Sequence, residues 1–214
     1  MTEVAVVTGA ARGIGLATTK RFVNQGMKVA MIDRDADVLL EEAQQIGDAA
    51  VPIVCDVSIP EQVDAAVAEI TDGLGACNAL INNAGVADFG PIAETSFERW
   101  RRVMATNLDG VFLVSQAMIP LLAKTAAESY ASIVNIASIS GLRASTLRVA
   151  YGTSKAAVIQ LTLQQAAELG ELGIRANCVA PGPVNKKTGT GGPHQGNPRG
   201  VPRCLAVESL RQRR

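Results

Sequence analysis

The sequence predicts a doubly wound parallel α/β sheet with helices on both faces. Strand-like apolar runs alternate with helix-length amphipathic stretches through residues 1–184, which is typical of strands joined by crossover helices. A glycine-rich turn joins the first strand-like run to the first helical stretch. The 214 residues are 48% hydrophobic and 3% aromatic, so one core can form mainly from aliphatic side chains.

Six short runs of aliphatic and β-branched residues predict the strands. The first run lies directly before the glycine turn, and the second ends at Asp33. In chain order, the predicted strands cover residues 4–8, 28–33, 51–55, 79–82, 132–137 and 175–179.

Amphipathic stretches between these runs predict the helices. Pro60 suits the first turn of the third helix, and Gly26, Gly47, Gly73 and Gly170 stand where helices should stop. The fourth stretch is long, and we expect two helices there or one helix with a bend. The predicted helices cover residues 14–25, 37–46, 60–72, 97–124 and 151–169.

The composition favours a cytoplasmic protein without a membrane partner. No run approaches the ~18 consecutive apolar residues of a membrane helix, and the first strand begins too early to leave room for a signal peptide. Cys55, Cys77, Cys178 and Cys204 form neither a CxxC motif nor a cluster with histidine. That spacing indicates buried reduced thiols, with no metal site and no disulfide framework.

The charge is distributed unevenly along the chain, although the net charge is zero. Residues 185–214 carry seven basic side chains against the single acid Glu208, and they are rich in glycine and proline. No apolar periodicity before Cys204 predicts a helix or a strand there. We therefore expect the folded domain to span residues 1–184, followed by a basic Gly/Pro-rich tail over residues 185–214.

The glycine turn, TGAARGIG over residues 8–15, predicts a pyrophosphate site. Gly9 permits the tight turn, Gly13 lets the backbone approach the phosphates, and Gly15 lets the helix and the strand pack closely. The N-terminus of the helix offers free N–H groups to the anion. The spacing is GxxxGxG, which differs from the GxGxxG of the common dinucleotide fingerprint.

Asp33 ends the second strand, eighteen residues beyond the last glycine of this turn. There a carboxylate can accept hydrogen bonds from both hydroxyls of an adenosine ribose and would repel a 2′-phosphate. The alternative is a helix N-cap, because Asp35 and Asp37 show that the segment is rich in acids. We favour ribose binding, although Arg12 and Arg34 lie close enough in sequence to meet a phosphate.

Polar residues also follow the third and fourth strands, at the carboxyl ends where such sheets bind ligands. They are Asp56 and the NNAG segment, residues 82–85. Tyr151 and Lys155 are four residues apart on a predicted helix, so both lie on one face. A phenol, with a usual pKa of about 10, needs a neighbouring cation to act as a base at neutral pH, and Lys155 can supply one. The alternative for this pair is ordinary surface amphipathicity.

Taken in order, these motifs resemble those of the classical short-chain dehydrogenase/reductase family, over residues 1 to about 185. The resemblance implies a Rossmann-type fold, a homotetramer, and an NAD(P)-dependent oxidoreductase that interconverts a secondary alcohol and a ketone. The matching positions are residues 8–15, Asp33, Asp56, residues 82–85, Asn107, Ser138, YGTSK at 151–155 and PG at 181–182.

The resemblance also implies the catalytic roles. Tyr151 would be the general acid/base that exchanges a proton with the reacting oxygen. Lys155 would favour the phenolate and bind the nicotinamide ribose, and Ser138 would orient the reacting oxygen. Asn107 would hold a backbone and water path for protons through Lys155, or, as the alternative, it is an interior helix residue bonded to the backbone.

For the cofactor, the resemblance implies contacts from the glycine turn and the strand ends. We expect NAD(H) in preference to NADP(H), because of Asp33. The expected contacts are Gly9, Arg12, Gly13, Ile14, Gly15, Asp33, Asp56, Val57, Asn83, Ala84, Gly85, Tyr151, Lys155, Pro181, Gly182 and Val184.

The substrate is less well specified by the sequence. A small or medium carbonyl compound and an acyl thioester fit the candidate lining residues equally well. These candidates are Val86, Asp88, Phe89, Ser140, Leu142 and Arg143.

The sequence departs from the family pattern after position 184. Lys186 stands where the family usually has a threonine, and residues 187–214 show no pattern for the family's lid helices, last crossover helix or final strand. We expect the tail to be a disordered, frame-shifted reading of an ordinary family C-terminus, with the last strand and the lid missing. Lys186-Lys187-Thr188 can be encoded by a run of adenines, where one inserted base is a plausible slip.

Two alternative functions follow from the tail. An NAD-binding module without turnover, inactive because of its altered C-terminus, is the first. The second is an interaction protein whose basic tail binds nucleic acid or an anionic surface. The tail has no aromatic residue to stack on a base, so we expect no nucleic-acid partner.

Overall fold

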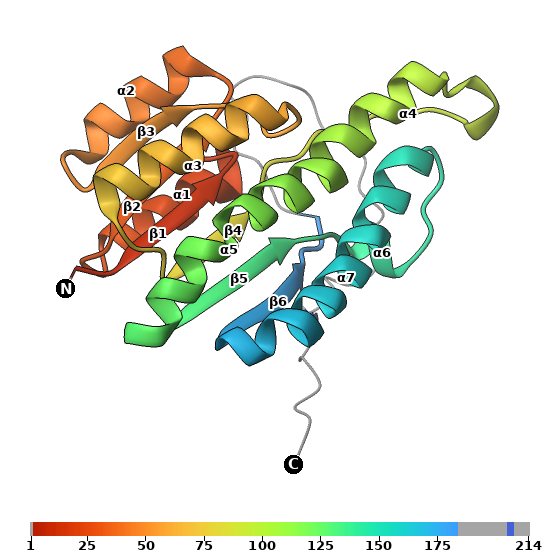
Figure 1. Cartoon of the computed structure of the whole chain (residues 1–214). Coiled ribbons are helices and arrows are strands. Elements are labelled where there is room, and N and C mark those ends of the chain that lie inside the picture. Colours follow the sequence, from red (N-terminus) through yellow and green to blue (C-terminus); the bar gives the residue numbers. More distant parts are fainter. Residues whose placement is uncertain (1, 184–204, 208–214) are drawn as a thin grey trace.

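Six parallel strands form one sheet in the computed structural model, which describes residues 2–183 and 205–207 (Figure 1). The strand order is β3-β2-β1-β4-β5-β6, so the chain builds outward from β1 on one side and then returns to place β4 beside β1. The doubly wound parallel fold predicted from the sequence is confirmed. The strands are β1 (Val4–Thr8), β2 (Lys28–Asp33), β3 (Ala50–Val54), β4 (Ala79–Asn82), β5 (Ala131–Ile136) and β6 (Ile174–Ala180).

A seventh, three-residue strand, β7 (Leu205–Val207), pairs antiparallel with β6. The sequence predicted neither a helix nor a strand before Cys204, and β7 lies just after that residue, in a segment with no pattern for a final strand. The apolar run is too short for periodicity to reveal it. The remaining predictions for the tail, including the frame shift, the disorder and Cys204, lie outside the described residues.

The helices follow the predicted alternation, with one helix or more after most strands. The long stretch from residue 97 is one continuous helical segment that contains a π-helical turn, η2 (Ala105–Asp109). A four-residue helix, α6 (Ile139–Leu142), was not predicted. The others are α1 (Gly13–Val23), α2 (Ala36–Ile46), α3 (Pro60–Leu74), α4 (Phe97–Met104), α5 (Gly110–Glu128) and α7 (Val149–Leu169), with 3₁₀ turns η1 (Ile92–Glu94) and η3 (Gly170–Leu172).

Alternate side chains of the strands supply two cores, one on each face of the sheet. Val6 and Leu80 pack with α3 and α5 on the face toward the viewer in Figure 1. Val7 and Met31 pack with α1 and α2 on the other face. The buried parallel strands therefore show nearly continuous apolar sequences, which is why the predicted strand bounds agree so closely with the structure.

Gly73 does not end a helix, contrary to the sequence prediction. It lies within α3, where an added Cβ would meet no atom within 4 Å. Gly75 is the C-cap instead, with a φ of +70° in the left-handed region. A glycine near a helix end thus indicates the stop only within a residue or two.

The segment Phe97–Glu128 is long and apolar enough to cross a membrane by length and composition alone. Its buried side chains include Val114, Met118 and Leu122, which belong to the core between α5 and the sheet. It is therefore the core helix of this fold. Among the described cysteines, Cys55, Cys77 and Cys178 are free and buried.

Candidate active site

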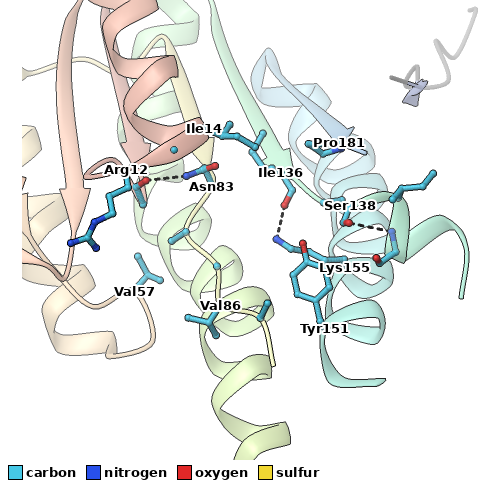
Figure 2. A pocket seen from close by; sticks show the side chains of 18 of the residues that line it. Arg12, Ile14, Val57, Asn83, Val86, Ile136, Ser138, Tyr151, Lys155 and Pro181 are labelled. Carbon is cyan, nitrogen blue, oxygen red and sulfur yellow. Dashed lines mark hydrogen bonds between the residues drawn. The ribbon is translucent and has the colours of Figure 1, made fainter. Parts of the chain in front are cut away.

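The carboxyl ends of the parallel strands open onto one cavity of about 890 Å³. The cavity lies where the strand order reverses between β1 and β4, the usual ligand position in such sheets. Its lining brings together most of the residues singled out by the sequence (Figure 2). They are Gly9, Arg12, Gly13, Ile14, Asp33, Asp56, Val57, Asn83, Ala84, Gly85, Ser138, Tyr151, Lys155, Pro181 and Gly182. Gly15 and Asn107 lie behind the lining, and Val184 lies outside the described residues.

The glycine turn has the geometry of an anion cradle. Gly9 and Gly13 have left-handed φ values of +65° and +57°. A Cβ on Gly13 would meet no protein atom within 4 Å, whereas a Cβ on Gly15 would lie 2.1 Å from the carbonyl oxygen of Gly9. Gly15 therefore lets α1 pack against the turn, and Gly13 leaves open space beside the helix N-terminus.

The N-terminus of α1 has no side-chain cap. Arg12 is the N-cap residue, and its side chain makes no capping hydrogen bond. The first amide groups of this eleven-residue helix therefore remain available to an anion in the cavity, where the helix dipole also favours negative charge. These features fit the pyrophosphate of a dinucleotide.

Asn83 joins the loop after β4 to the glycine turn through hydrogen bonds (Figure 2). Its Nδ2 donates to the carbonyl oxygens of Thr8 at 2.9 Å and Gly9 at 3.1 Å. The amides of Asn83 and Ala84 both donate to Thr8 Oγ1 at 3.0 Å. The Asn83 side chain and these two amides thus hold the loop against the glycine turn, and Asn83, Ala84 and Gly85 line the cavity.

Asp33 is not the N-cap of α2, which is Asp35. Its Oδ2 accepts the amide of Ala11 at 3.0 Å, and its Oδ1 accepts the amide of Asp35 at 3.1 Å. The carboxylate is thereby held at the rim of the cavity, beside the glycine turn. The capping alternative for Asp33 is wrong, because the N-cap of the helix lies two residues later.

The two arginines near Asp33 each pair with another acid. Arg12 Nη2 lies 2.5 Å from Asp35 Oδ2, and Arg34 Nη1 lies 3.5 Å from Asp56 Oδ2. The Arg12 hydrogen bond holds the pKa of Asp35 below its ordinary value. Burial acts to raise the pKa of Asp56, but hydrogen bonds from Ser58 and the nearby Arg34 outweigh it and lower that pKa.

Ser138, Tyr151 and Lys155 gather at the other end of the cavity (Figure 2). Lys155 Nζ donates to the carbonyl oxygen of Ile136 at 2.7 Å and lies 6.0 Å from the centroid of the Tyr151 ring. Burial lowers the pKa of Lys155 to about 8. Ser138 caps α6, and its Oγ accepts the amide of Ser140 at 3.1 Å, which leaves the Ser138 hydroxyl proton free to donate.

Asn107 lies in the π-helical turn η2 and is fully buried. Its Oδ1 accepts the Val86 amide at 2.7 Å, and its Nδ2 donates to the Val86 carbonyl oxygen at 2.9 Å and to Ser154 Oγ at 3.0 Å. Gly85 makes this approach possible, since a Cβ there would lie 3.3 Å from Asn107 Oδ1 and 3.5 Å from Lys155 Nζ. The two interpretations of Asn107, an interior helix residue bonded to the backbone and a residue that holds a backbone segment in place, both correspond to these contacts with Val86.

Several candidates for the substrate end are placed elsewhere. Val86 and Ser140 line the cavity, whereas Phe89, Leu142 and Arg143 do not. Asp88 also lies outside the lining, because Arg99 and Arg102 hold it in ion pairs.

The sequence analysis missed three polar lining residues, Ser145, Thr146 and Arg148. They belong to the loop between α6 and α7. Arg148 is three residues before Tyr151, so helical spacing could have placed it on the face of the tyrosine.

Comparisons with known proteins agree with this geometry. A model of the short chain dehydrogenase family matches residues 3–194. A 2-(R)-hydroxypropyl-CoM dehydrogenase of Xanthobacter autotrophicus is 39% identical over 191 residues, which cover 86% of this chain and 75% of that protein.

Two solved structures also match the fold of this chain. The NADH complex of a 3-ketoacyl-(acyl-carrier-protein) reductase from Brucella melitensis matches with a TM-score of 0.82 and 32% identity, covering 84% of this chain and 75% of that one. An NAD⁺-bound xylitol dehydrogenase matches with a TM-score of 0.80 and 34% identity, covering 84% of this chain and 70% of that one.

Proposed function

Because this chain belongs to the short-chain dehydrogenase/reductase family and is an NAD(P)-dependent oxidoreductase acting on CH–OH groups, we propose that it interconverts a secondary alcohol and a ketone with NAD(H). The proposal assigns Ser138, Tyr151 and Lys155 as catalytic residues and Asn107 as a positioning residue. The observation that carries it is the gathering of those three side chains at one end of the cavity whose other end is the uncapped N-terminus of α1.

The nicotinamide, when bound, supplies or accepts the hydride. The chain's own residues handle the proton and the orientation of the substrate. Tyr151 gives a proton to the carbonyl oxygen during reduction and takes it back during alcohol oxidation. Ser138, with its hydroxyl proton free, donates a hydrogen bond that holds the reacting oxygen beside the tyrosine.

Lys155 and Asn107 support this proton transfer. The ammonium of Lys155 favours the phenolate of Tyr151, and its contact with the Ile136 carbonyl fixes it in place. Asn107 holds the Val86 backbone against the same group of residues through two hydrogen bonds. Because both polar atoms of this buried amide have partners, the Asn107 side chain is held in one orientation. It also donates to Ser154 Oγ, and so links the loop after β4 to α7.

The remaining expected residues would hold the cofactor. The pyrophosphate would lie against residues 9–15, the adenosine ribose on Asp33, and the adenine beside Asp56 and Val57. Residues 83–85 would lie on the adenosine side of the cofactor, and Pro181 and Gly182 would contact the nicotinamide, with Lys155 on its ribose. Val184 has the same proposed role but lies outside the described residues.

We propose NAD(H) over NADP(H) as the cofactor. A 2′-phosphate on the adenosine ribose would meet the Asp33 carboxylate at close range. Arg12 and Arg34, which could offset that repulsion, are already paired with Asp35 and Asp56. Both arginines are more than half exposed and their ion pairs are weak, so the proposal depends mainly on the Asp33 carboxylate.

A homo-oligomer in the cytoplasm is the proposed state of the protein. Phe97, Phe112 and Leu163 place exposed apolar side chains on α4, α5 and α7, which supports contacts between copies of the chain. The unpaired buried Cys55 and Cys77 support a reducing compartment. Light scattering of the purified protein measures its oligomeric state directly.

The test of the proposed function is Tyr151→Phe. It should lower kcat by about 10²–10⁴, the usual contribution of a general acid/base, while the Kd for NADH changes little. Tyr130→Phe is the matched control, because Tyr130 is the only other tyrosine and lies outside the cavity lining. NADH fluorescence titration and steady-state rates with a panel of secondary alcohols and ketones supply the measurements.

A Tyr151→Phe variant that kept most of its kcat would contradict the acid/base assignment. Saturable NADH binding by the wild type, with no oxidation or reduction of any member of the panel, would instead support the NAD-binding module without turnover.

A further inference from the structure

The reacting end of the cavity holds a cation that the proposed catalytic set does not use. Arg148 lines the cavity, and its guanidinium carbon lies 6.0 Å from the centroid of the Tyr151 ring. Among the described residues, the ion pairs of arginine involve Arg12, Arg34, Arg99 and Arg102, and none involves Arg148. Within the part of the chain that the structure describes, this charge therefore has no carboxylate partner.

The backbone of Arg148 is fixed on both sides. The Gly90 amide donates to the carbonyl oxygen of Leu147 at 3.0 Å, and the Gly152 amide donates to the carbonyl oxygen of Arg148 at 2.7 Å. Leu147 has a φ of +63°, the only described non-glycine residue in the left-handed region. A leucine in that conformation costs free energy, and it persists only where surrounding contacts hold it.

The guanidinium itself rests on an aromatic ring. The Arg148 guanidinium carbon lies 4.8 Å from the centroid of Phe89. Phe89 is held in turn by α4, because Arg99 Nη2 donates to the Phe89 carbonyl oxygen at 3.0 Å and Arg99 also pairs with Asp88. A guanidinium that stacks by its face keeps its N–H groups in the plane free to donate.

Neither of the acids that line the cavity forms an ion pair with Arg148. Asp33 and Asp56 follow β2 and β3, whereas Arg148 lies in the loop that follows β5 and α6. In the strand order, β2 and β5 are three spacings apart, or roughly 14 Å. Both acids also have partners of their own, in backbone amides for Asp33 and in Ser58 and Arg34 for Asp56.

The groups around Arg148 are donors as well. Ser145 and Thr146 line the cavity within three residues of it. Hydroxyls beside a guanidinium suit an oxyanion, which can accept from both kinds of group.

We propose that Arg148 determines specificity by binding an oxyanion, such as a carboxylate or sulfonate, at the non-reacting end of the substrate. This inference rests on the proposed alcohol/ketone function and adds the chemical class of the substrate. The planar fork of the guanidinium binds such a group through two parallel hydrogen bonds, while the carbonyl lies against Ser138 and Tyr151.

Dead-end complexes test this without turnover. With NAD⁺ bound, no hydride is available, so a ketone binds and does not react. The probes are 4-oxopentanoate, 5-oxohexanoate and 6-oxoheptanoate, each compared with its neutral amide by calorimetric titration. For at least one chain length, the acid should bind about tenfold or more tightly than its amide.

Arg148→Gln should remove most of that preference by weakening the acid, with the amide changed less than about twofold. Arg143→Gln is the control, because Arg143 lies in the same loop, is exposed and does not line the cavity. It should behave as the wild type. The Kd for NAD⁺ alone should stay the same in all three proteins.

Three results would overturn the proposal. They are equal binding of acid and amide at every chain length, equal weakening of both by Arg148→Gln, and a loss of NAD⁺ affinity in that variant. The second would make Arg148 a structural residue, and the third would assign it to the cofactor phosphates. Failure of the wild type to bind NAD⁺ would count against the proposed function instead, and the same titrations without NAD⁺ would still test the acid preference.

Discussion

Gly15→Ala should destabilise the fold, although it places a better helix former inside α1. The new Cβ would lie 2.1 Å from the Gly9 carbonyl oxygen, 2.6 Å from Asn83 Nδ2 and 2.8 Å from the Gly9 carbonyl carbon. Two of these atoms are backbone, so no side-chain rotation can relieve the contact. The turn must move away from the helix or the helix away from the turn.

The expected free energy combines two opposing effects. Overpacking of a tight contact costs about 3 kcal/mol, at the upper end of the usual range because backbone must shift. Alanine in place of glycine gains about 1 kcal/mol within a helix. The net loss is about 2 kcal/mol, which for a domain of this size lowers Tm by about 4–8 °C.

Gly73→Ala is the matched control for this substitution. Gly73 also lies within a helix, and a Cβ there would meet no atom within 4 Å. Only the helix-propensity gain applies, so this variant should be stabilised by up to about 1 kcal/mol. Urea and thermal unfolding followed by circular dichroism measure both variants.

The same displacement should weaken NADH binding in Gly15→Ala, because the Gly9 carbonyl oxygen belongs to the turn that faces the cavity. Gly73→Ala should leave the Kd for NADH unchanged. If Gly15→Ala proved as stable as Gly73→Ala, the close packing of α1 on the turn would be wrong as an explanation of this glycine.

Two further substitutions test the cofactor site and the buried lysine. Asp33→Ala should shift the ratio of kcat/KM values toward NADP(H), and a wild type that already preferred NADP(H) would exclude the proposed role of Asp33. Lys155→Met tests the pKa of about 8 that burial gives Lys155, against 10.5 for the exposed group. Between these values the native state binds fewer protons than the unfolded state, so the penalty for burying the charge is complete below about pH 8 and declines as pH rises. Relative to Lys155→Met, the wild type should gain about 2 kcal/mol of unfolding free energy between about pH 8 and pH 10, and a pH-independent difference would refute the lowered pKa.

Most of the fold was predictable because its determinants are local. Residues 4–8, 28–33 and 79–82 were predicted as strands and are β1, β2 and β4 with the same bounds. Each is an apolar run enclosed on both faces, so burial does not alternate and the run itself marks the strand. The π-helical turn around Asn107 was not predictable in the same way, because it depends on hydrogen bonds to Val86, a tertiary partner.

The loop between α6 and α7 escaped prediction for a similar reason. Arg148 reaches the cavity because Leu147 adopts a left-handed conformation and pairs through its carbonyl with Gly90. Nothing in the local sequence favours that conformation for a leucine. The contact spans more than fifty residues of chain, and only the folded structure brings its two ends together.

The acids around the expected ribose site show what pattern alone leaves open. Asp33, Asp35 and Asp56 differ little as sequence features, yet each meets different donors. Asp33 accepts backbone amides at the cavity rim, whereas the other two face Arg12 and Arg34. Three carboxylates against two guanidiniums leave this cluster one negative charge in excess. We therefore expect cofactor preference to depend on the whole cluster, and we expect Asp33 to favour NAD(H) because its carboxylate, unlike the other two, accepts backbone amides and not an arginine.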